Sequence, residues 1–227
     1  MSYFLLKKQF LILTLQKNLT MDSFNRKNHW ENIYQTKPLT EVSWYQPTPQ
    51  TSLDFIQELN TPLIAKIIDV GGGDSFLVDH LLKLGYTNIT VLDISEAAIN
   101  RAKARLGDLA TQVSWIVSDI TEFKPNEQYD LWHDRAAFHF LTNQTDINKY
   151  VEIASNYINK NGQLIIGTFS ENGPTKCSGI EIKQYSINDL ETIFSPAFKK
   201  IKCSTINHPT PFNTVQNFTF CIFKKRN

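Results

Sequence analysis

From about residue 64 onward, short apolar runs alternate with segments whose apolar residues recur at helical spacing. Five of the runs are typical of buried strands, at residues 66–70, 88–92, 112–117, 129–133 and 163–169. The segments between them predict helices at residues 74–84, 95–106 and 146–158, with Ser95 and Gly107 as end signals. Because strands and helices alternate, the pattern predicts βαβ units and a parallel sheet.

The last forty residues follow a different pattern. A helix is expected from Ser186 to about residue 194, followed by two β-rich stretches at 198–207 and 214–223. The sequence HPTPFN joins these stretches and is too short to hold a helix, so the two strands should be antiparallel neighbours. The predicted fold class is therefore α/β, with a mostly parallel seven-stranded sheet, a C-terminal antiparallel hairpin and helices on both faces.

The first twenty residues carry three lysines and no acid, and their apolar run at 10–13 is too short to span a bilayer. Met21 follows directly. We expect residues 1–27 to be an N-terminal extension, either disordered or the result of a start assigned too early. The folded domain is expected to cover residues 28–227, and no membrane partner is expected.

Composition narrows the possible functions. The chain has 227 residues, 41% of them hydrophobic and 20% charged, which indicates one globular domain. A net charge of +1 gives no reason to expect a nucleic-acid partner. Cys177, Cys203 and Cys221 form no CxxC pair, so we expect neither a metal site nor a disulfide framework. This usage favours a reducing, cytoplasmic location. No sequence pattern sets an oligomeric state.

Three consecutive glycines follow the first predicted strand, in the sequence KIIDVGGGDSF. Glycine is costly to order, so it is kept where the backbone turns sharply or approaches a ligand. In open α/β sheets, cofactors bind at this end of the strands, where helix N-terminal amides can face negative groups. We expect Gly71 and Gly73 to allow a close approach. Asp69 should steady the loop by accepting amide hydrogen bonds.

Acidic residues also end the next two predicted strands. Asp93 lies twenty residues after Gly73, where a carboxylate can accept hydrogen bonds from both ribose hydroxyls. Asp119 follows the third strand, where it could accept a hydrogen bond from the amine of a base. The three strand ends should meet at one edge of the sheet, so together these residues predict a nucleotide-like cofactor site.

This arrangement resembles the class I S-adenosylmethionine-dependent methyltransferases, whose fold is Rossmann-like. Their DxGxGxG motif is matched by residues 69–75, except that Ser75 replaces the last glycine. The resemblance covers residues 28–224. It implies S-adenosylmethionine as cofactor, S-adenosylhomocysteine as product, and glycines packed against the methionine portion. It also implies the following cofactor-binding residues: Asp69, Gly71, Gly72, Gly73, Asp93, Ile94, Asp119, Ile120, His133, Trp30 and Tyr34.

The resemblance extends to the fourth strand and to the segment before the sheet. The fourth strand ends in YDLWHDRAAFHFL, which in this superfamily faces the reactive methyl group. It implies catalytic or acceptor-binding roles for His133, Asp134 and Arg135. Residues 28–62 are similar to a front segment that covers the cofactor in a branch with protein-lysine and thiopurine-type methyltransferases. Trp30 and Tyr34 would belong to that cover.

Structural roles are open for the same residues. His133 could cap a strand, Asp134 and Arg135 could form a local ion pair, and the front aromatics could be core residues. Cys177 has no evident base nearby in sequence and is expected to be structural.

Three functions fit the pattern to different degrees. A methyltransferase is favoured. Its acceptor is expected to be a small molecule or a protein side chain, because the (D/N)PP(Y/F) motif of nucleic-acid methyltransferases is absent. A nicotinamide-dependent oxidoreductase would need glycine in place of Phe76. A non-catalytic S-adenosylmethionine-binding protein would keep the same pocket residues.

Overall fold

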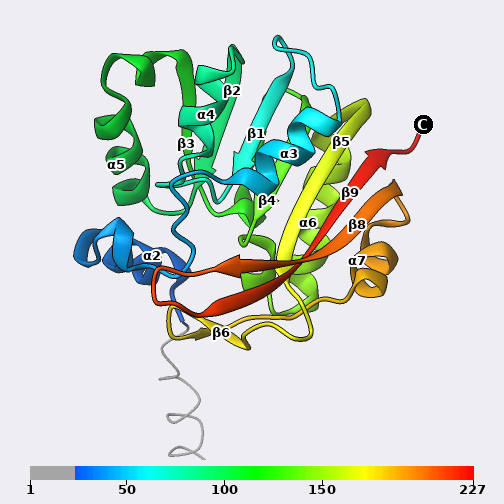
Figure 1. Ribbon diagram of the computed structural model, residues 1–227. Helices are drawn as coiled ribbons and strands as arrows, with labels where there is room; N and C mark the ends of the chain where they lie inside the picture. The colour runs from blue at the N-terminus through cyan, green and yellow to red at the C-terminus, as the bar shows by residue number, and fades with distance from the viewer. Residues whose placement is uncertain (1–23) are drawn as a thin grey trace, which may run out of the picture.

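The computed structural model describes residues 24–227 and has a seven-stranded sheet at its centre. The strand order is β3-β2-β1-β4-β5-β9-β8, with β1 to β5 parallel and the last two strands antiparallel (Figure 1). The strands are β1 (Lys66–Val70), β2 (Asn88–Asp93), β3 (Val113–Val117), β4 (Tyr129–Arg135), β5 (Ile158–Phe169), β8 (Phe198–Pro209) and β9 (Val215–Lys225). The predicted fold class is confirmed. The predictions for residues 1–23 lie outside the described part of the chain.

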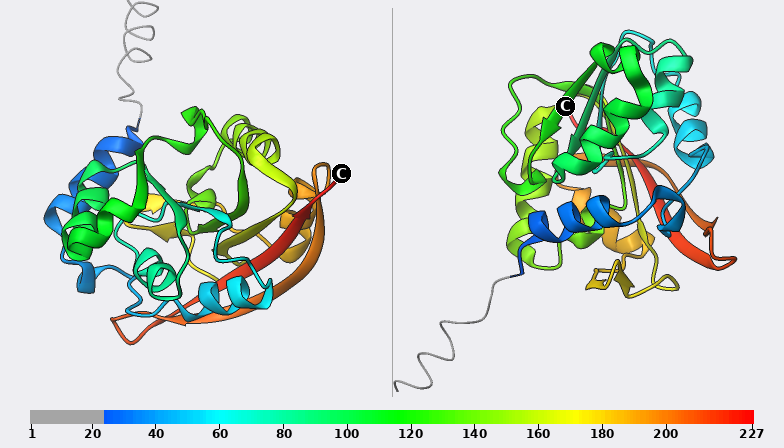
Figure 2. Two further views of the ribbon diagram at one scale, coloured as in Figure 1. Left: turned by 90° about the horizontal axis from the view of Figure 1, so that it is seen from above. Right: turned by 90° about the vertical axis from the view of Figure 1, so that its left-hand side faces the viewer.

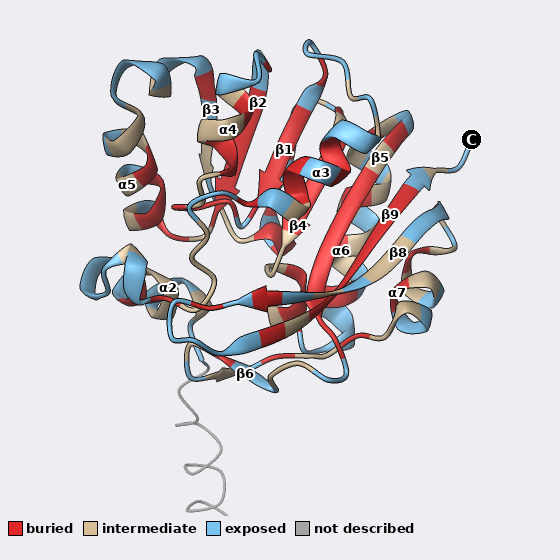
Figure 3. Ribbon diagram, in the orientation of Figure 1, coloured by how far each residue is buried: buried red, intermediate tan, exposed pale blue. Residues whose placement is uncertain are grey.

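Helices cover both faces of this sheet, as Figure 2 shows. One layer contains α3 (Gln50–Glu58), α4 (Leu77–Lys83) and α5 (Glu96–Leu106). The other layer contains α6 (Gln144–Tyr157) and α7 (Ile187–Phe194). Since side chains alternate along a strand, Ile67 of β1 packs in the first layer and Ile68 in the second. Strands buried on both sides therefore read as continuous apolar runs, and most of the sheet is buried in Figure 3.

Local hydrogen bonds set where the helices begin. The Ser95 hydroxyl accepts a hydrogen bond from the Ala98 amide at 3.2 Å, which caps α5 as predicted. Ser186 and Asp189 form a reciprocal capping box at the start of α7. The helix predicted from residue 74 begins only at Leu77, because residues 72–75 form a turn. In that turn the Ser75 amide donates to the Gly72 carbonyl, and the Ser75 hydroxyl accepts from the Leu77 amide.

The β8–β9 hairpin holds a disulfide that the sequence analysis did not expect. Cys203 and Cys221 are directly opposite each other in the antiparallel register, with Cα atoms 4.1 Å apart. They are 18 positions apart in sequence, so only the strand pairing brings them together. A second hairpin, formed by β6 (Lys176–Cys177) and β7 (Ile180–Glu181), was also not predicted.

No helix in residues 24–227 is both long and apolar enough to cross a membrane.

Candidate active site

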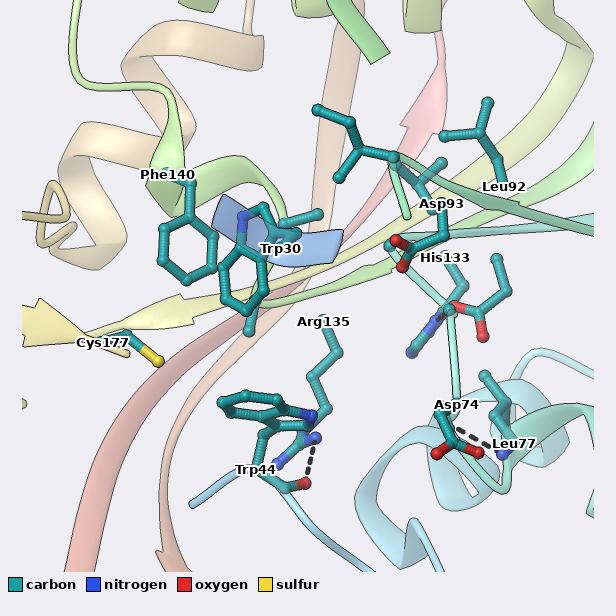
Figure 4. Close-up of a pocket in the computed structure, with 18 of the residues that line it drawn as sticks. Trp30, Trp44, Asp74, Leu77, Leu92, Asp93, His133, Arg135, Phe140 and Cys177 are labelled. Carbon is teal, nitrogen blue, oxygen red and sulfur yellow. Dashed lines mark hydrogen bonds and ion pairs between the residues drawn. The ribbon is translucent and has the colours of Figure 1, made fainter. Parts of the chain in front are cut away.

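A cavity opens at the carboxyl ends of β1, β2 and β4 (Figure 4). Its walls come from the glycine loop, the ends of these strands, the segment before the sheet and the β9 strand. Most of the residues implied by the resemblance line it, namely Trp30, Tyr34, Asp69, Gly71, Gly72, Asp93, Ile94, Asp119, Ile120, His133 and Arg135. Gly73 and Asp134 are not among the lining residues.

The glycine loop is tied to the neighbouring strand. The Gly71 and Gly72 amides donate hydrogen bonds to the Leu92 carbonyl at 2.7 and 3.2 Å. Gly71 and Gly73 have φ angles of +68° and +35°, which side chains rarely adopt. A Cβ on Gly71 would lie 2.6 Å from the Cβ of Ala137, and one on Gly73 would lie 2.6 Å from Asp93 Oδ2. The loop can therefore lie this close to Ala137 and Asp93 only because it lacks side chains.

Asp69 does not hold the loop amides, contrary to the sequence prediction. Its Oδ1 atom lies 2.7 Å from His133 Nδ1, and His133 Nε2 lies 2.8 Å from the Ser52 hydroxyl. The pairing follows from the parallel register, which places Asp69 of β1 beside His133 of β4. All three side chains are buried. Both ring nitrogens of His133 are thus engaged, and the chain of contacts joins β1, β4 and α3.

Asp93 is buried at the end of β2. Its Oδ1 atom accepts a hydrogen bond from the Ser95 amide at 2.8 Å. Burial raises the pKa of this carboxyl to about 7, and the nearby Asp69 carboxylate adds to the rise. The hydroxyls of a bound ribose could donate to the carboxylate and would favour its ionised form.

The raised pKa predicts how stability depends on pH. Between pH 4 and 7 the folded protein holds a proton on Asp93 that the unfolded chain has lost. The contribution of Asp93 to the free energy of unfolding therefore falls as pH rises. From pH 5 to 8, wild type should lose on the order of 2 kcal/mol of unfolding free energy relative to Asp93→Asn. Urea unfolding of both proteins at several pH values measures this difference. A constant difference would contradict the prediction.

Asp119 makes an ion pair at the outer end of the cavity. Its Oδ2 atom lies 3.1 Å from Arg26 Nη2, and Arg26 also contacts Asp146 at 3.0 Å. Its Oδ1 atom accepts from the amide and the hydroxyl of Thr121. Ile120 and Ile94 line the cavity beside it. An apolar surface next to a carboxylate suits a flat heterocycle with an exocyclic amine.

Helix α2 (Arg26–Thr36) carries the front aromatics over the cavity. The Trp30 ring lies 5.7 Å from the Trp44 ring and 4.8 Å from the Phe140 ring, measured between centroids. Glu31 fixes this helix by accepting hydrogen bonds from the Ser95 hydroxyl at 2.8 Å and from the Ala97 amide. A carboxylate at the start of α5 is also favoured by the helix dipole.

A network of two arginines ties the same helix to the glycine loop. Asp74 Oδ2 lies 2.9 Å from Arg101 Nε, and its Oδ1 atom pairs with Arg105. Arg101 Nη1 also donates to the carbonyls of Tyr34 and Lys37, both at 2.9 Å. Asp74 thereby connects the loop, α5 and the end of α2 through a single carboxylate.

The side chains of the last two residues of β4, Asp134 and Arg135, point in different directions. Asp134 is fully buried and accepts hydrogen bonds from the Ala137 and Phe138 amides and from the Tyr150 hydroxyl at 2.7 Å. Burial raises its pKa to about 6. Its side chain shapes the turn after β4 and does not reach the cavity. Arg135 does line the cavity, and its Nη1 atom donates to the Trp44 carbonyl at 3.2 Å.

Several lining residues were not identified from sequence, namely Ser52, Asp74, Phe140, Cys177, Gln216 and Phe218. Gln216 and Phe218 are two apart on β9, so they share one face of the strand. That spacing was readable, but nothing in the sequence placed this face of the strand at the cavity. Cys177, expected to be structural, lies in the wall, and burial raises the pKa of its thiol to about 11.

The sequence of the central region matches a known family model. Residues 67–162 match a model described as a methyltransferase domain. The eEF1A lysine and N-terminal methyltransferase of Mus musculus is 24% identical over 225 residues, covering 87% of this chain and 31% of that protein. The malonyl-[acyl-carrier protein] O-methyltransferase of Anoxybacillus flavithermus is 33% identical over 107 residues, covering 46% and 39%. The chain thus spans only about a third of the length of these relatives.

Solved structures share the same fold at low sequence identity. A protein from work on the conversion of a disulfide bond into a thioacetal group in echinomycin biosynthesis has a TM-score of 0.72 and 17% identity, covering 88% of this chain and 92% of its own. The N-methyltransferase NodS of Bradyrhizobium japonicum, solved with S-adenosyl-l-homocysteine, has a TM-score of 0.67 and 16% identity, covering 89% and 100%.

Proposed function

Because the chain has the class I methyltransferase fold and contains a methyltransferase domain, we propose that it is an S-adenosylmethionine-dependent methyltransferase. The acceptor would be a small molecule or a protein side chain. The observation that carries this proposal is the placement of Gly71, Asp93 and Asp119 at three neighbouring strand ends around one cavity.

Each part of the cofactor has a matching group in this proposal. Asp93 would accept hydrogen bonds from the ribose hydroxyls, since its buried carboxyl lies directly under the glycine loop. Ile94, Asp119 and Ile120 would bind the adenine. The glycine loop would lie against the methionine portion. Relatives and a structural neighbour that are named as methyltransferases support the choice of cofactor.

The residues at the end of β4 would act mainly by shaping the pocket. S-adenosylmethionine supplies a methyl group on a positively charged sulfur. The aromatic cover of Trp30, Tyr34 and Trp44 would exclude water from that methyl, and positioning is the main source of rate in such a site. His133, with both ring nitrogens engaged, would orient Asp69 and would not take a proton from the acceptor. Asp134 would hold the turn that carries Arg135.

Calorimetric titration with S-adenosylmethionine, S-adenosylhomocysteine and NADH tests the proposal directly. We expect micromolar binding of the first two ligands and none of the third. NADH binding alone would favour the oxidoreductase, and no binding of any ligand would contradict the methyltransferase. Binding without turnover of any acceptor would leave the non-catalytic binding protein. A search for methylated acceptors by mass spectrometry distinguishes the methyltransferase from the non-catalytic binding protein.

We also propose that the protein is cytoplasmic and that it has no nucleic-acid partner. In a reducing cytoplasm, the disulfide between Cys203 and Cys221 that this structure contains would be reduced to two thiols. Alkylation of freshly lysed cells followed by mass spectrometry reports their state.

A further inference from the structure

The inner part of the cavity lies beyond the glycine loop, and the proposed cofactor site leaves it free. We call it the inner chamber and define it by Trp44, Arg135, Phe140, Cys177, Gln216 and Phe218. Trp30 borders it, with its ring 5.7 Å from the Trp44 ring and 4.8 Å from the Phe140 ring between centroids. In Figure 4, Phe140 and Cys177 lie to one side of Trp30, Asp93 and His133 lie to the other, and Arg135 and Trp44 lie below it. If the proposed function is correct, the methyl acceptor binds here.

Arg135 places an incompletely paired cation in the chamber. Its Nη1 atom donates to the Trp44 carbonyl, and its guanidinium lies 5.3 Å from the centre of the Phe218 ring. Its Nη2 atom is buried and has no hydrogen-bond partner among residues 24–227. The amide oxygen of Gln216 is likewise buried without a partner in the described chain. Burial lowers the pKa of Arg135 only to about 10, so the group stays protonated at neutral pH.

Within residues 24–227 no carboxylate forms an ion pair with Arg135, although the Asp69 charge favours its protonated form. Asp69 is paired with His133, and Asp74 is paired with Arg101 and Arg105. Asp93 and Asp119 lie on the side assigned to the cofactor's ribose and adenine. The Cys177 thiol is neutral near pH 7, since burial raises its pKa to about 11. An unpaired buried donor is costly, so an anion that reaches Arg135 would relieve that cost.

No usable general base from residues 24–227 lies at the chamber. Both ring nitrogens of His133 are engaged. His139 lies outside the cavity lining, its Nδ1 atom accepts from the Phe169 amide, and burial with the nearby Arg135 charge lowers its pKa to about 3. A group with so low a pKa takes a proton poorly at neutral pH. A carboxyl, hydroxyl, thiol or ammonium acceptor that binds here must therefore lose its proton before it reaches the chamber.

We propose that the inner chamber is a subsite for a small, planar, anionic acceptor whose ionised oxygen or sulfur receives the methyl group. Arg135 binds the anion, and the aromatic walls of Trp44, Phe140 and Phe218 hold its plane. This inference rests on the proposed methyltransferase function. A lysine ammonium fits poorly, because it would face the Arg135 cation and would have to lose a proton with no base to accept it.

The reaction balances without any further reactant. A lone pair on the acceptor's anionic oxygen or sulfur forms a bond to the methyl carbon, while the bond from that carbon to the sulfonium sulfur breaks. The electron pair of the broken bond stays on sulfur, which becomes a neutral thioether. One anion and one cation give two neutral groups at the reacting atoms, and no proton is transferred. Loss of charge separation is favourable in a chamber that excludes water.

Binding to the S-adenosylhomocysteine-loaded protein tests the chamber without requiring turnover. Trp30 and Trp44 line it, so their fluorescence reports occupancy. Benzoate and thiophenol are the carboxylate and thiolate probes, and benzylamine is a cation of similar shape. We expect saturable quenching by at least one anion and none by benzylamine at the same concentration. Equal or tighter binding of benzylamine, or no anion binding up to the millimolar range, would overturn the proposal.

Substitutions of Arg135 test whether its guanidinium binds the anion. Arg135→Met should weaken anion binding by about 10-fold to 100-fold, and Arg135→Lys should restore part of it, because charge-assisted hydrogen bonds are among the strongest. Lys199→Met removes a positive charge from the exposed surface of β8 and should change nothing. Unchanged anion binding in Arg135→Met would refute the assignment.

Cofactor binding is measured on the same proteins. It distinguishes failure of the proposed methyltransferase function from failure of the acceptor subsite alone. Failure of wild type to bind S-adenosylhomocysteine would remove the proposed function itself. Normal binding in wild type with a loss in both folded Arg135 variants would place Arg135 at the cofactor and overturn the acceptor subsite. With S-adenosylmethionine, mass spectrometry for methyl benzoate and thioanisole then distinguishes a carboxylate acceptor from a thiolate.

Discussion

Replacing Asp74 with alanine should lower the free energy of unfolding by about 3 kcal/mol, as expected when one partner of a buried ion-pair network is removed. The Asp74 side chain is only 3% exposed, whereas Arg101 and Arg105 are 30% and 19% exposed. Water can therefore reach both guanidiniums in part, which places the expected loss at the lower end of the range for buried pairs. Arg105 also keeps its second partner, Asp79.

Urea unfolding followed by circular dichroism measures this loss. Asp108→Ala is a matched control, because it removes an exposed carboxylate near the end of α5 that makes no ion pair within the described chain. We expect the control to stay within about 0.5 kcal/mol of wild type. A change of similar size in the Asp74 variant would show that the network contributes little.

Asp93→Ala should weaken S-adenosylhomocysteine binding by about 10-fold to 100-fold, which corresponds to about 1–3 kcal/mol from lost hydrogen bonds to a charged group. The same change removes a buried carboxyl whose pKa is raised to about 7. At pH 8 the cofactor-free variant should therefore lose little stability, although the Ser95 amide loses its acceptor. Ligand affinity and stability thus respond differently, which separates a binding role from a structural one.

Calorimetry at pH 8 measures the affinity, and thermal unfolding without ligand measures the stability. Asp93→Asn is the conservative partner, since its amide oxygen can still accept from the Ser95 amide. It should retain normal stability and still bind more weakly than wild type. Wild-type affinity in a folded Asp93→Ala protein would remove this residue from the cofactor site.

The succession of strands and helices along the chain was predictable, because it depends on the local pattern of apolar and polar residues. Apolar runs of strand length, separated by helical periodicity and capped by residues such as Ser95, define the order of elements. The position of Asp93 and Asp119 followed as well, because the carboxyl ends of parallel strands share one edge of the sheet. The final hairpin was predictable from the length of its connection alone.

What could not be predicted depends on register and on packing between distant segments. The contact of Asp69 with His133 needs the exact alignment of β1 with β4, and a shift of one residue would separate them. The disulfide between Cys203 and Cys221 depends on register in the same way. Asp134 and Arg135 are neighbours in sequence, yet strand alternation sends one into the core and the other into the cavity.

The walls of the cavity come from separate parts of the chain. Side chains facing the proposed cofactor are carried by the ends of β1, β2 and β3, three neighbouring strands of the sheet. The walls of the inner chamber are carried by the front segment, the turn after β4, the β6–β7 hairpin and β9. The front segment and the β6–β7 hairpin lie outside the seven-stranded sheet and can change in sequence without disturbing its strands. The architecture therefore lets selection or laboratory evolution alter which molecule is modified while the donor chemistry stays fixed.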